Sequence, residues 1–384
     1  MSPLADPVAV LCVSAEQERG FVVRRHLLLD GSGSEDPQRV ARAMVGLHAA
    51  RLTSPWVAMR ARVATFESEQ LRSRLVGERS LVKLRCMRRT LHVLPLDLAA
   101  VAHAATLDQR AGTCRATLRR LGHSERALLA VTRRVRERLA GRTEPYRALE
   151  RAIVSASPPR DAALVRLAIR WLWEHGELVY LDLSPSLHHE RRYFALTAEA
   201  VPGLRLNATG VQAARDALVM AHVRAFGPVS VRDVAWWSGM GTVHVRNALS
   251  RHRDMLAAVR VEGLAPDLVV HVDDLADLTS AAPVPSDHVS LLGYEDPALK
   301  GYFETRARFV SAEGYRLLFN TIGEARASVM VGGRVVGVWR WDRRRRAIES
   351  QVFERLSPRV RRTLAERLGD MESFLQREAL SATS

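Results

Sequence analysis

Residues 230–252 read Ser230-Val-Arg-Asp-Val-Ala-Trp-Trp-Ser-Gly-Met-Gly-Thr-Val-His-Val-Arg-Asn-Ala-Leu-Ser-Arg-His252 and predict a helix-turn-helix. The stretch opens on an N-cap serine, turns at Gly-Met-Gly, and continues into a second helix that Thr242 is expected to cap. A helix over 211–226 precedes it, and residues 257–263 begin a β-hairpin after it. Helices followed by such a wing form a winged helix, an arrangement that often binds DNA but also occurs in proteins that never touch it.

The N-terminal part of the chain predicts a first copy of the same unit. Asp36-Pro37 and Ser54-Pro55 each supply an N-cap followed by the first helical residue. A third helix is predicted around 67–76, and the β-branched and basic residues of 81–94 indicate two strands. Three helices and a hairpin again make a winged helix.

The first of these helices is expected to carry a histidine at its end. Val40, Met44 and Leu47 recur at 3.6-residue spacing, which predicts that the helix runs as far as His48. A dense group of guanidinium groups follows in the predicted strands of 81–94. A histidine ahead of a guanidinium cluster suggests an enzyme that works on an anionic polymer.

A further copy lies between these two. Helices are predicted near 124–140, 145–155 and 162–175, followed by strands at 178–183 and 188–196 around a Ser-Pro-Ser turn. The pair of strands reads as a second, longer wing whose tip is basic.

After the third unit the sequence becomes rich in β-forming residues. Residues 329–339 predict two strands around a Gly-Gly turn, and 341–347 predict a hairpin tip loaded with arginine. Ser357-Pro358 begins a final helix, and the preceding sheet is expected to close as a small barrel. Pro and small residues make 279–287 the best linker candidate.

The expected fold class is therefore α+β, with tandem winged helix-turn-helix units followed by a small β-barrel and a C-terminal helix. The expected domains are unit 1 over 15–123 with the candidate active-site residue, unit 2 over 124–205 with the long wing, unit 3 over 206–278, and the barrel with the last helix over 287–384.

The charge of the chain favours nucleic acid as a partner. Lys and Arg number 57 against 42 Asp and Glu, which gives a net charge of +15, and only Lys83 and Lys300 are lysines. Arginine matches phosphate and guanine edges with two hydrogen bonds, so an arginine-rich excess suits DNA. A GC-rich genome also favours arginine, but that reading explains the Arg-to-Lys ratio and not the net charge. A merely basic surface is the alternative.

Composition excludes several other classes. A chain of 384 residues that is 47% hydrophobic can bury real cores, so a disordered protein is excluded. No apolar run approaches the roughly 18 residues of a membrane span, and no charged lead-in or cleavage site marks a signal peptide, so a cytoplasmic location is expected. Cys12, Cys86 and Cys114 lack the spacing of a zinc site or a disulfide framework. We expect no metal and no cofactor.

Four short motifs carry a family resemblance that extends over most of the chain. They are Leu47-His-Ala-Ala50, where the family has Leu-Gln-Ala-Gln or Gln-x-Asp; Met87-Arg-Arg-Thr-Leu-His92, where it has Met-Arg-Gly-Thr-Leu-His; Asp296, Gly301 and Arg306 at its Asp-x4-Gly-x4-Arg; and residues 331–339 at its Val-x-Gly-Arg-Val-Val-Gly-x-Trp. The chain resembles the winged-helix DNA glycosylases of the AlkZ/YcaQ type.

The resemblance implies a fold and an activity. Such proteins carry tandem winged helices in a C-shaped arrangement closed by a β-barrel, and they remove bulky or crosslinked alkylpurines from DNA, sometimes as self-resistance to a genotoxin. The implied protein is a monofunctional DNA glycosylase for purines of the N7-alkylguanine type, acting on double-stranded DNA as a monomer.

The resemblance also implies the catalytic residues. In the family two polar residues separated by one apolar residue position the water that attacks the sugar; here these positions are His48 and Ala50. Two alternatives follow: His48 acts with a group from elsewhere, or the chain has lost hydrolysis and is a DNA- or lesion-binding protein such as a regulator. A third reading is that His48 only caps a helix or satisfies a core carbonyl.

The remaining candidate residues are expected to contact DNA. Arg51, Arg85, Arg88, Arg89 and Arg306 are phosphate-binding candidates, with a solvated wing surface as the alternative for the group in 85–89. His92 either lines the cleft or fixes the wing by a hydrogen bond. At the second wing, His188, His189, Arg191 and Arg192 either reach DNA or form an exposed polar tip. The adjacent Trp236 and Trp237 favour helix packing over base stacking.

Overall fold

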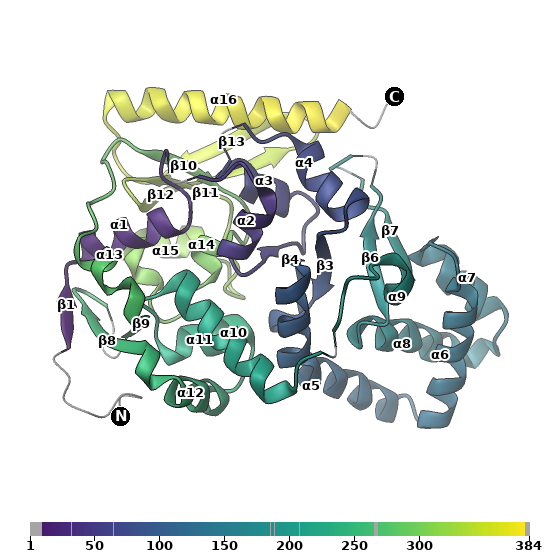
Figure 1. Ribbon diagram of the computed structural model, residues 1–384. Coiled ribbons are helices and arrows are strands. Elements are labelled where there is room, and N and C mark those ends of the chain that lie inside the picture. Colours follow the sequence, from purple (N-terminus) through teal and green to yellow (C-terminus); the bar gives the residue numbers. More distant parts are fainter. Residues whose placement is uncertain are drawn as a thin grey trace.

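The computed structural model describes residues 10–31, 33–63, 65–184, 186–187, 189–206, 208–264 and 268–380. Its elements alternate between helices and short strands, which confirms the α+β class (Figure 1). The α-helices are α1 Ala15–Arg25, α2 Pro37–Ala43, α3 Ser54–Arg60, α4 Ser68–Arg72, α5 Leu96–Arg120, α6 Glu125–Leu139, α7 Tyr146–Ser155, α8 Ala162–Glu174, α9 Thr197–Ala200, α10 Val211–Phe226, α11 Val231–Ser238, α12 Thr242–Arg251, α13 Leu275–Thr279, α14 Pro297–Lys300, α15 Ala312–Leu318 and α16 Pro358–Leu380. The strands are β1 Leu11–Val13, β2 Leu47–His48, β3 Leu81–Arg85, β4 Leu91–Pro95, β5 Glu144–Pro145, β6 Leu178–Asp182, β7 Arg192–Leu196, β8 Leu256–Val261, β9 Leu268–His271, β10 Val289–Leu292, β11 Ser328–Val331, β12 Arg334–Asp342 and β13 Ala347–Val352.

The first sheet has the order β2-β4-β3 and follows helices α2, α3 and α4. The Asp36 side chain caps α2 by accepting a hydrogen bond from the Gln38 backbone, as the Asp-Pro pair predicts. The predicted hairpin is β3 with β4, paired antiparallel from Leu81 opposite Pro95 to Arg85 opposite Leu91. These elements lie where the sequence predicts them, apart from β2, which was expected to be helical. The N-cap of α3 is Thr53, so Ser54 is the first residue of that helix and not its cap.

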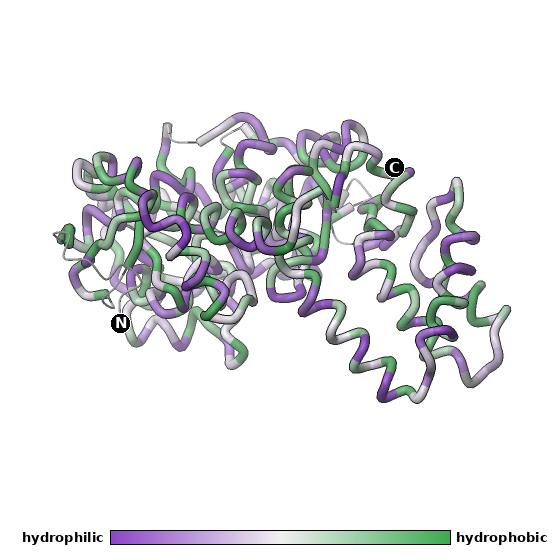
Figure 2. Tube along the Cα trace, turned by 60° about the horizontal axis from the view of Figure 1, so that its bottom comes forward, coloured by the Kyte–Doolittle hydropathy of each residue, from purple (hydrophilic) through white to green (hydrophobic). Residues whose placement is uncertain are grey.

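The second sheet has the order β5-β7-β6 and belongs to a helical lobe. Helices α6, α7 and α8 lie within a few residues of their predicted bounds. Strand β6 pairs antiparallel with β7, which begins at Arg192, so the hairpin is shorter than the predicted strand over 188–196. The long helix α5, which the sequence patterns did not predict, leads from the first sheet into this lobe (Figure 1). Figure 2 shows hydrophilic and hydrophobic residues alternating along the helices of the lobe, as amphipathic helices require.

The third sheet, β1-β8-β9, accompanies the helix-turn-helix α11–α12. Ser230 forms a capping box with Asp233, and Gly239 ends α11 in the left-handed conformation with φ 79°. The N-cap of α12 is Gly241, so Thr242 is the first residue of the helix and not its cap. Strand β1, near the N-terminus, pairs in parallel with β8, so two strands that are far apart in the sequence share one sheet.

The fourth sheet is open. Its order is β10-β11-β12-β13, and no pairing of β10 with β13 occurs among the described strands, so the expected closed barrel is not found. The turn Gly332-Gly333 has φ 56° and 75°, as its sequence predicts, and joins β11 to β12. Helix α16 runs along this sheet and packs on β10 and β13 (Figure 1).

The segment expected to be a linker is packed. A Cβ at Gly20 in α1 would lie 2.0 Å from the carbonyl oxygen of Ala282, so the backbone of 279–287 rests directly on this helix. Ala281 and Val284 also pack against the core. The part of the chain after residue 287 is therefore held against the N-terminal helix, and residues from both ends can meet in one site.

Candidate functional site

His48 lies on strand β2 and not at the end of a helix. Its ring is 4% exposed and sits opposite His92 of β4, with the ring centroids 5.6 Å apart and nearly perpendicular. Its Nδ1 atom is buried and has no hydrogen-bond partner among the described residues. His48 therefore neither caps a helix nor satisfies a core carbonyl through this atom.

The backbone before His48 explains why the helical spacing was misleading. Helix α2 ends at Ala43, and Val45 and Gly46 then adopt left-handed conformations with φ 46° and 94°. A Cβ at position 46 would lie 2.6 Å from the side chain of Leu94, so the chain needs glycine there for conformation and for space. This turn directs the chain from the helix into the sheet.

The two histidines are neutral at neutral pH. Burial, and then the nearby charge of Lys300, hold the pKa of His48 well below its usual value. Burial likewise lowers the pKa of His92 to about 3. Nδ1 of His92 lies 3.3 Å from the Thr90 carbonyl and 3.6 Å from Cys86 Sγ, so His92 fixes the wing, one of its two predicted roles. Each neutral ring keeps one unprotonated nitrogen, and in His48 the buried Nδ1 has no hydrogen-bond partner among the described residues.

Buried ion pairs next to these histidines were not foreseen from the sequence, although Asp296 belongs to one of the quoted motifs. Lys300 is buried and ion-paired with Glu295, a residue with φ 56° that also accepts a hydrogen bond from the Ala325 backbone at 2.7 Å. Asp296 forms a buried two-bond ion pair with Arg62 at 2.7 and 3.0 Å. One sequence signal was available, since Lys300 is one of only two lysines in the chain.

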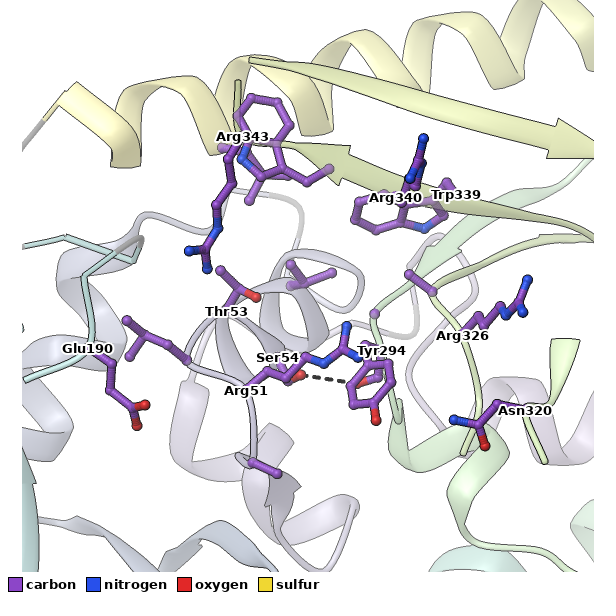
Figure 3. A pocket seen from close by; sticks show the side chains of 17 residues that line it. Arg51, Thr53, Ser54, Glu190, Tyr294, Asn320, Arg326, Trp339, Arg340 and Arg343 are labelled. Atoms are coloured by element: carbon purple, nitrogen blue, oxygen red, sulfur yellow. Dashed lines mark hydrogen bonds between the residues drawn. The ribbon is translucent and has the colours of Figure 1, made fainter. Parts of the chain in front are cut away.

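An open cleft of about 840 Å³ begins next to His48. Ala50, and not His48, is part of its wall. Figure 3 shows Arg51, Tyr294 and Arg326 around the same space. Seven of the other lining residues are basic or aromatic, and they come from segments far apart in the sequence: Arg51, Tyr294, Arg326, Trp339, Arg340, Trp341 and Arg343. The guanidinium carbon of Arg51 lies 3.3 Å from the centroid of the Tyr294 ring. A cleft that combines arginines with aromatic rings suits a nucleotide chain.

The three arginines of the first wing lie in different environments. Arg85 is partly buried and pairs with Glu174 at 3.0 Å. Arg88 and Arg89 both adopt left-handed conformations, with φ 48° and 59°. The guanidinium of Arg88 lies 3.8 Å from the Trp236 ring, whereas Arg89 is exposed. Arg89 thus presents the most accessible guanidinium of the three.

Arg306 is placed in the interior. It is 3% exposed, and its guanidinium donates to the carbonyls of Tyr302 at 2.7 Å and Gly323 at 3.3 Å. Its position gives no support to the predicted phosphate contact. The same guanidinium lies 4.3 Å from the ring of Trp236, and Trp237 is buried, so both tryptophans pack in the fold as predicted.

The tip of the second wing lies at the edge of the cleft. His188 lies outside the described residues. His189 and Arg191 are exposed, and Arg192 pairs at 3.2 Å with Glu190, which lines the cleft. The structure thus brings part of this tip close to Ala50 and Arg51, although these residues lie far apart in the sequence.

The described part of the chain contains no helix that is both long and apolar enough to cross a membrane. Within the same residues, no three His, Cys, Asp or Glu side chains are grouped so that they could hold a metal ion.

Comparisons with known proteins agree with this geometry. The family described as DNA glycosylase AlkZ-like matches residues 41–374. Among solved structures the chain is similar to the Streptomyces sahachiroi DNA glycosylase AlkZ, with a TM-score of 0.75 and 21% sequence identity over 97% of each chain. A search of the curated proteins found no match.

Proposed function

The chain belongs to the AlkZ-like family of DNA glycosylases, and from this premise we propose that it hydrolyses the N-glycosidic bond of bulky alkylated purines of the N7-alkylguanine type. The proposed substrate is double-stranded DNA, and the proposed enzyme is a cytoplasmic monomer that releases the base without cutting the strand. We also propose that its three helix-and-sheet units act as tandem winged helices, and that its biological role is self-resistance to a DNA-alkylating natural product.

The placement of His48 carries the proposal. A neutral imidazole with an unpartnered, buried Nδ1 stands two residues before the cleft wall, at the position where the family has its first polar catalytic residue. Unpartnered ring nitrogens also occur in the buried His26, His103 and His222, so the place of His48 in the family motif, two residues before the cleft wall, is what selects it. A neutral histidine can accept a proton from water.

Release of an N7-alkylated purine requires few protein groups besides one that accepts a proton from water. A purine alkylated at N7 is cationic, so the bond from its N9 to the sugar C1′ breaks without a general acid. The sugar becomes oxocarbenium-like, a water adds to C1′, and the proton of that water passes to His48. The protonated His48 side chain then loses this proton to solvent.

Arginines around the cleft are proposed to hold the DNA backbone. Arg51, Arg326, Arg340 and Arg343 surround the same space, and exposed Arg89, His189 and Arg191 would extend the contact along the duplex. Such contacts give affinity that depends on salt and not on sequence.

Ala50 favours a second candidate function. The family's second polar group is replaced by a methyl group that faces the cleft. A chain that had lost hydrolysis would remain a non-hydrolytic DNA- or lesion-binding protein.

Incubation with defined lesions separates the two functions. The protein is mixed with duplexes that contain N7-methylguanine or a bulky N7-alkylguanine, and free base and alkali-labile abasic sites are measured. Release of base supports the glycosylase. If the natural chain releases none while the double variant His48→Gln with Ala50→Gln does, the chain is a degenerate binder.

A further inference from the structure

The face of the Tyr294 ring is covered by a planar cation. The guanidinium carbon of Arg51 stands 3.3 Å from the ring centroid, at the wall of the cleft that begins beside Ala50 (Figure 3). Arg51 is itself exposed, so a desolvated core does not enforce this stacking. The contact shows that a flat, delocalised positive charge fits this surface of the cleft.

The edge of the same ring faces a negative charge. The Tyr294 hydroxyl is hydrogen-bonded to the carboxylate of Glu324, and this bond lowers the pKa of Glu324. Burial, and then the same hydrogen bond, raise the pKa of Tyr294, so the phenol stays neutral while the carboxylate is ionised. An ionised acceptor on the hydroxyl makes the ring face more attractive to a cation.

The carboxylate is held in place by Asn320. The Asn320 side-chain amide donates to Glu324 at 2.7 Å, and the Glu324 backbone donates to the Asn320 side-chain oxygen at 2.9 Å. Asn320 also lines the cleft. Ring, carboxylate and amide therefore form one preformed surface.

The backbone of Tyr294 is fixed as well. Its carbonyl accepts a hydrogen bond from the Ser54 hydroxyl at 3.1 Å, and a Cβ at the preceding Gly293 would lie 3.1 Å from the side chain of Val57. The following residue, Glu295, is buried in its ion pair with Lys300. A surface that does not have to be ordered on binding loses little entropy when it accepts a ligand.

We propose that the face of Tyr294 recognises the cationic purine ring of the lesion, and that Arg51 leaves this face to contact a phosphate when the lesion enters. The inference deepens the proposed function and rests on it for the identity of the ligand. An N7-alkylated guanine is a planar, delocalised cation like the guanidinium that it replaces, whereas unmodified guanine is neutral. The surface would thus select damaged DNA by charge, and the volume of the cleft leaves room for bulky substituents.

The experiment measures binding without hydrolysis. The probes are two duplexes, one with 2′-fluoro-N7-methylguanosine and one with 2′-fluoroguanosine; the fluorine disfavours the oxocarbenium-like transition state and keeps the base attached. The wild-type protein should bind the cationic duplex roughly 3- to 30-fold more tightly than the neutral one, the range expected for a cation over an aromatic face.

Variants assign that preference to Tyr294. Tyr294→Leu should remove it and leave the Kd for the neutral duplex within about twofold, and Tyr294→Phe should retain part of it. Glu324→Gln should reduce it. Arg51→Ala should weaken both duplexes and keep the preference, because it removes a phosphate contact and not the ring. Tyr315→Leu, which removes an exposed tyrosine outside the cleft wall, is the matched control, and the thermal midpoint of each variant reports folding.

The outcomes are separable from those of the proposed function. A wild-type protein without any preference, or a folded Tyr294→Leu variant that keeps it, overturns the inference. A preference that disappears in Arg51→Ala but not in Tyr294→Leu also overturns it. Because the probes do not depend on base release, a chain that cannot hydrolyse DNA still gives a readable result.

Discussion

His48 and Arg51 are three residues apart and belong to two different environments. His48 is buried on strand β2, opposite His92 of β4 and near the buried Lys300, whereas Arg51 is exposed on the wall of an open cleft. The inner region is held by buried ion pairs, and the cleft wall combines exposed arginines with the fixed ring of Tyr294. The comparison suggests that the fold positions the chemistry and that the wall supplies the binding.

Loss of the buried pair beneath the cleft should give the largest effect on stability. Asp296→Ala leaves the Arg62 guanidinium buried without its carboxylate, which should lower the free energy of unfolding by about 3–5 kcal/mol. Chemical denaturation measures this loss. Glu137→Ala, which breaks an exposed pair with Arg133, is the control and should cost about 0.5 kcal/mol. Equal losses would show that the inner region is not the rigid one.

The inner region should also be sensitive to acid. His26, His48, His92, His103 and His222 are buried, and burial lowers the pKa of each, to about 4 for His222. Below about pH 6.5 the unfolded chain binds protons that the folded chain does not, so stability must fall as the pH decreases from 6.5 towards the folded pKa values. Each such histidine adds about 1.4 kcal/mol per pH unit to the slope.

His222→Gln tests this assignment. Glutamine can replace the hydrogen bond from His222 Nε2 to the Gly301 carbonyl but does not titrate. The free energy of unfolding, measured between pH 6.5 and 4, should fall less steeply than in the wild type. A parallel, merely shifted curve would mean that His222 is protonated in the folded protein.

Changes on the cleft wall should affect binding and leave stability intact. Arg326→Ala and Arg340→Ala should each make the dependence of log K on log salt shallower by about 0.9 if each guanidinium neutralises one phosphate. Unfolding free energies should change by no more than about 0.5 kcal/mol. Arg133→Ala, outside the cleft wall, should leave the salt dependence unchanged. If all three variants gave a shallower slope, the cleft arginines would contribute to DNA binding no more than any other basic residue of the surface.

The smallest effect is expected at the tip of the second wing. Replacing His188, His189, Arg191 and Arg192 by serine should reduce base release from bulky adducts a few-fold more than from methylated purines, with nearly unchanged stability. The ratio of the two rates is the measurement. Equal losses would make the tip a general phosphate contact, and no loss would make it a solvated turn.

Much of the fold could be predicted because its signals are local. Asp36-Pro37, Ser230, Gly239 and the Gly332-Gly333 turn each act on neighbouring residues, and their elements occur where expected. The β2 strand could not be seen, because two left-handed residues interrupt a helical spacing that otherwise continues. Helix α5 has many buried alanines and no clear apolar face, so its periodicity gave no signal.

The candidate site could be predicted only in part. His48 was found from its motif, but its environment depends on contacts with residues more than 240 positions away. The stacking of Arg51 on Tyr294 joins residues equally far apart in the sequence, and the interior position of Arg306 depends on its packing against Trp236. Sequence patterns identify residue types that suit DNA, while the packing decides which of them can reach it.

Single-turnover base release by His48→Ala tests the separation of chemistry from binding most directly. The rate on an N7-alkylguanine duplex should fall by about 10²- to 10⁴-fold, the range for loss of a general base, while the Kd for that duplex stays within a few-fold of the wild-type value. His48→Gln, the residue of the family pattern, should retain activity. A His48→Ala protein that releases base at the wild-type rate, or one that loses DNA affinity in parallel with its activity, would contradict the assignment of the chemistry to His48.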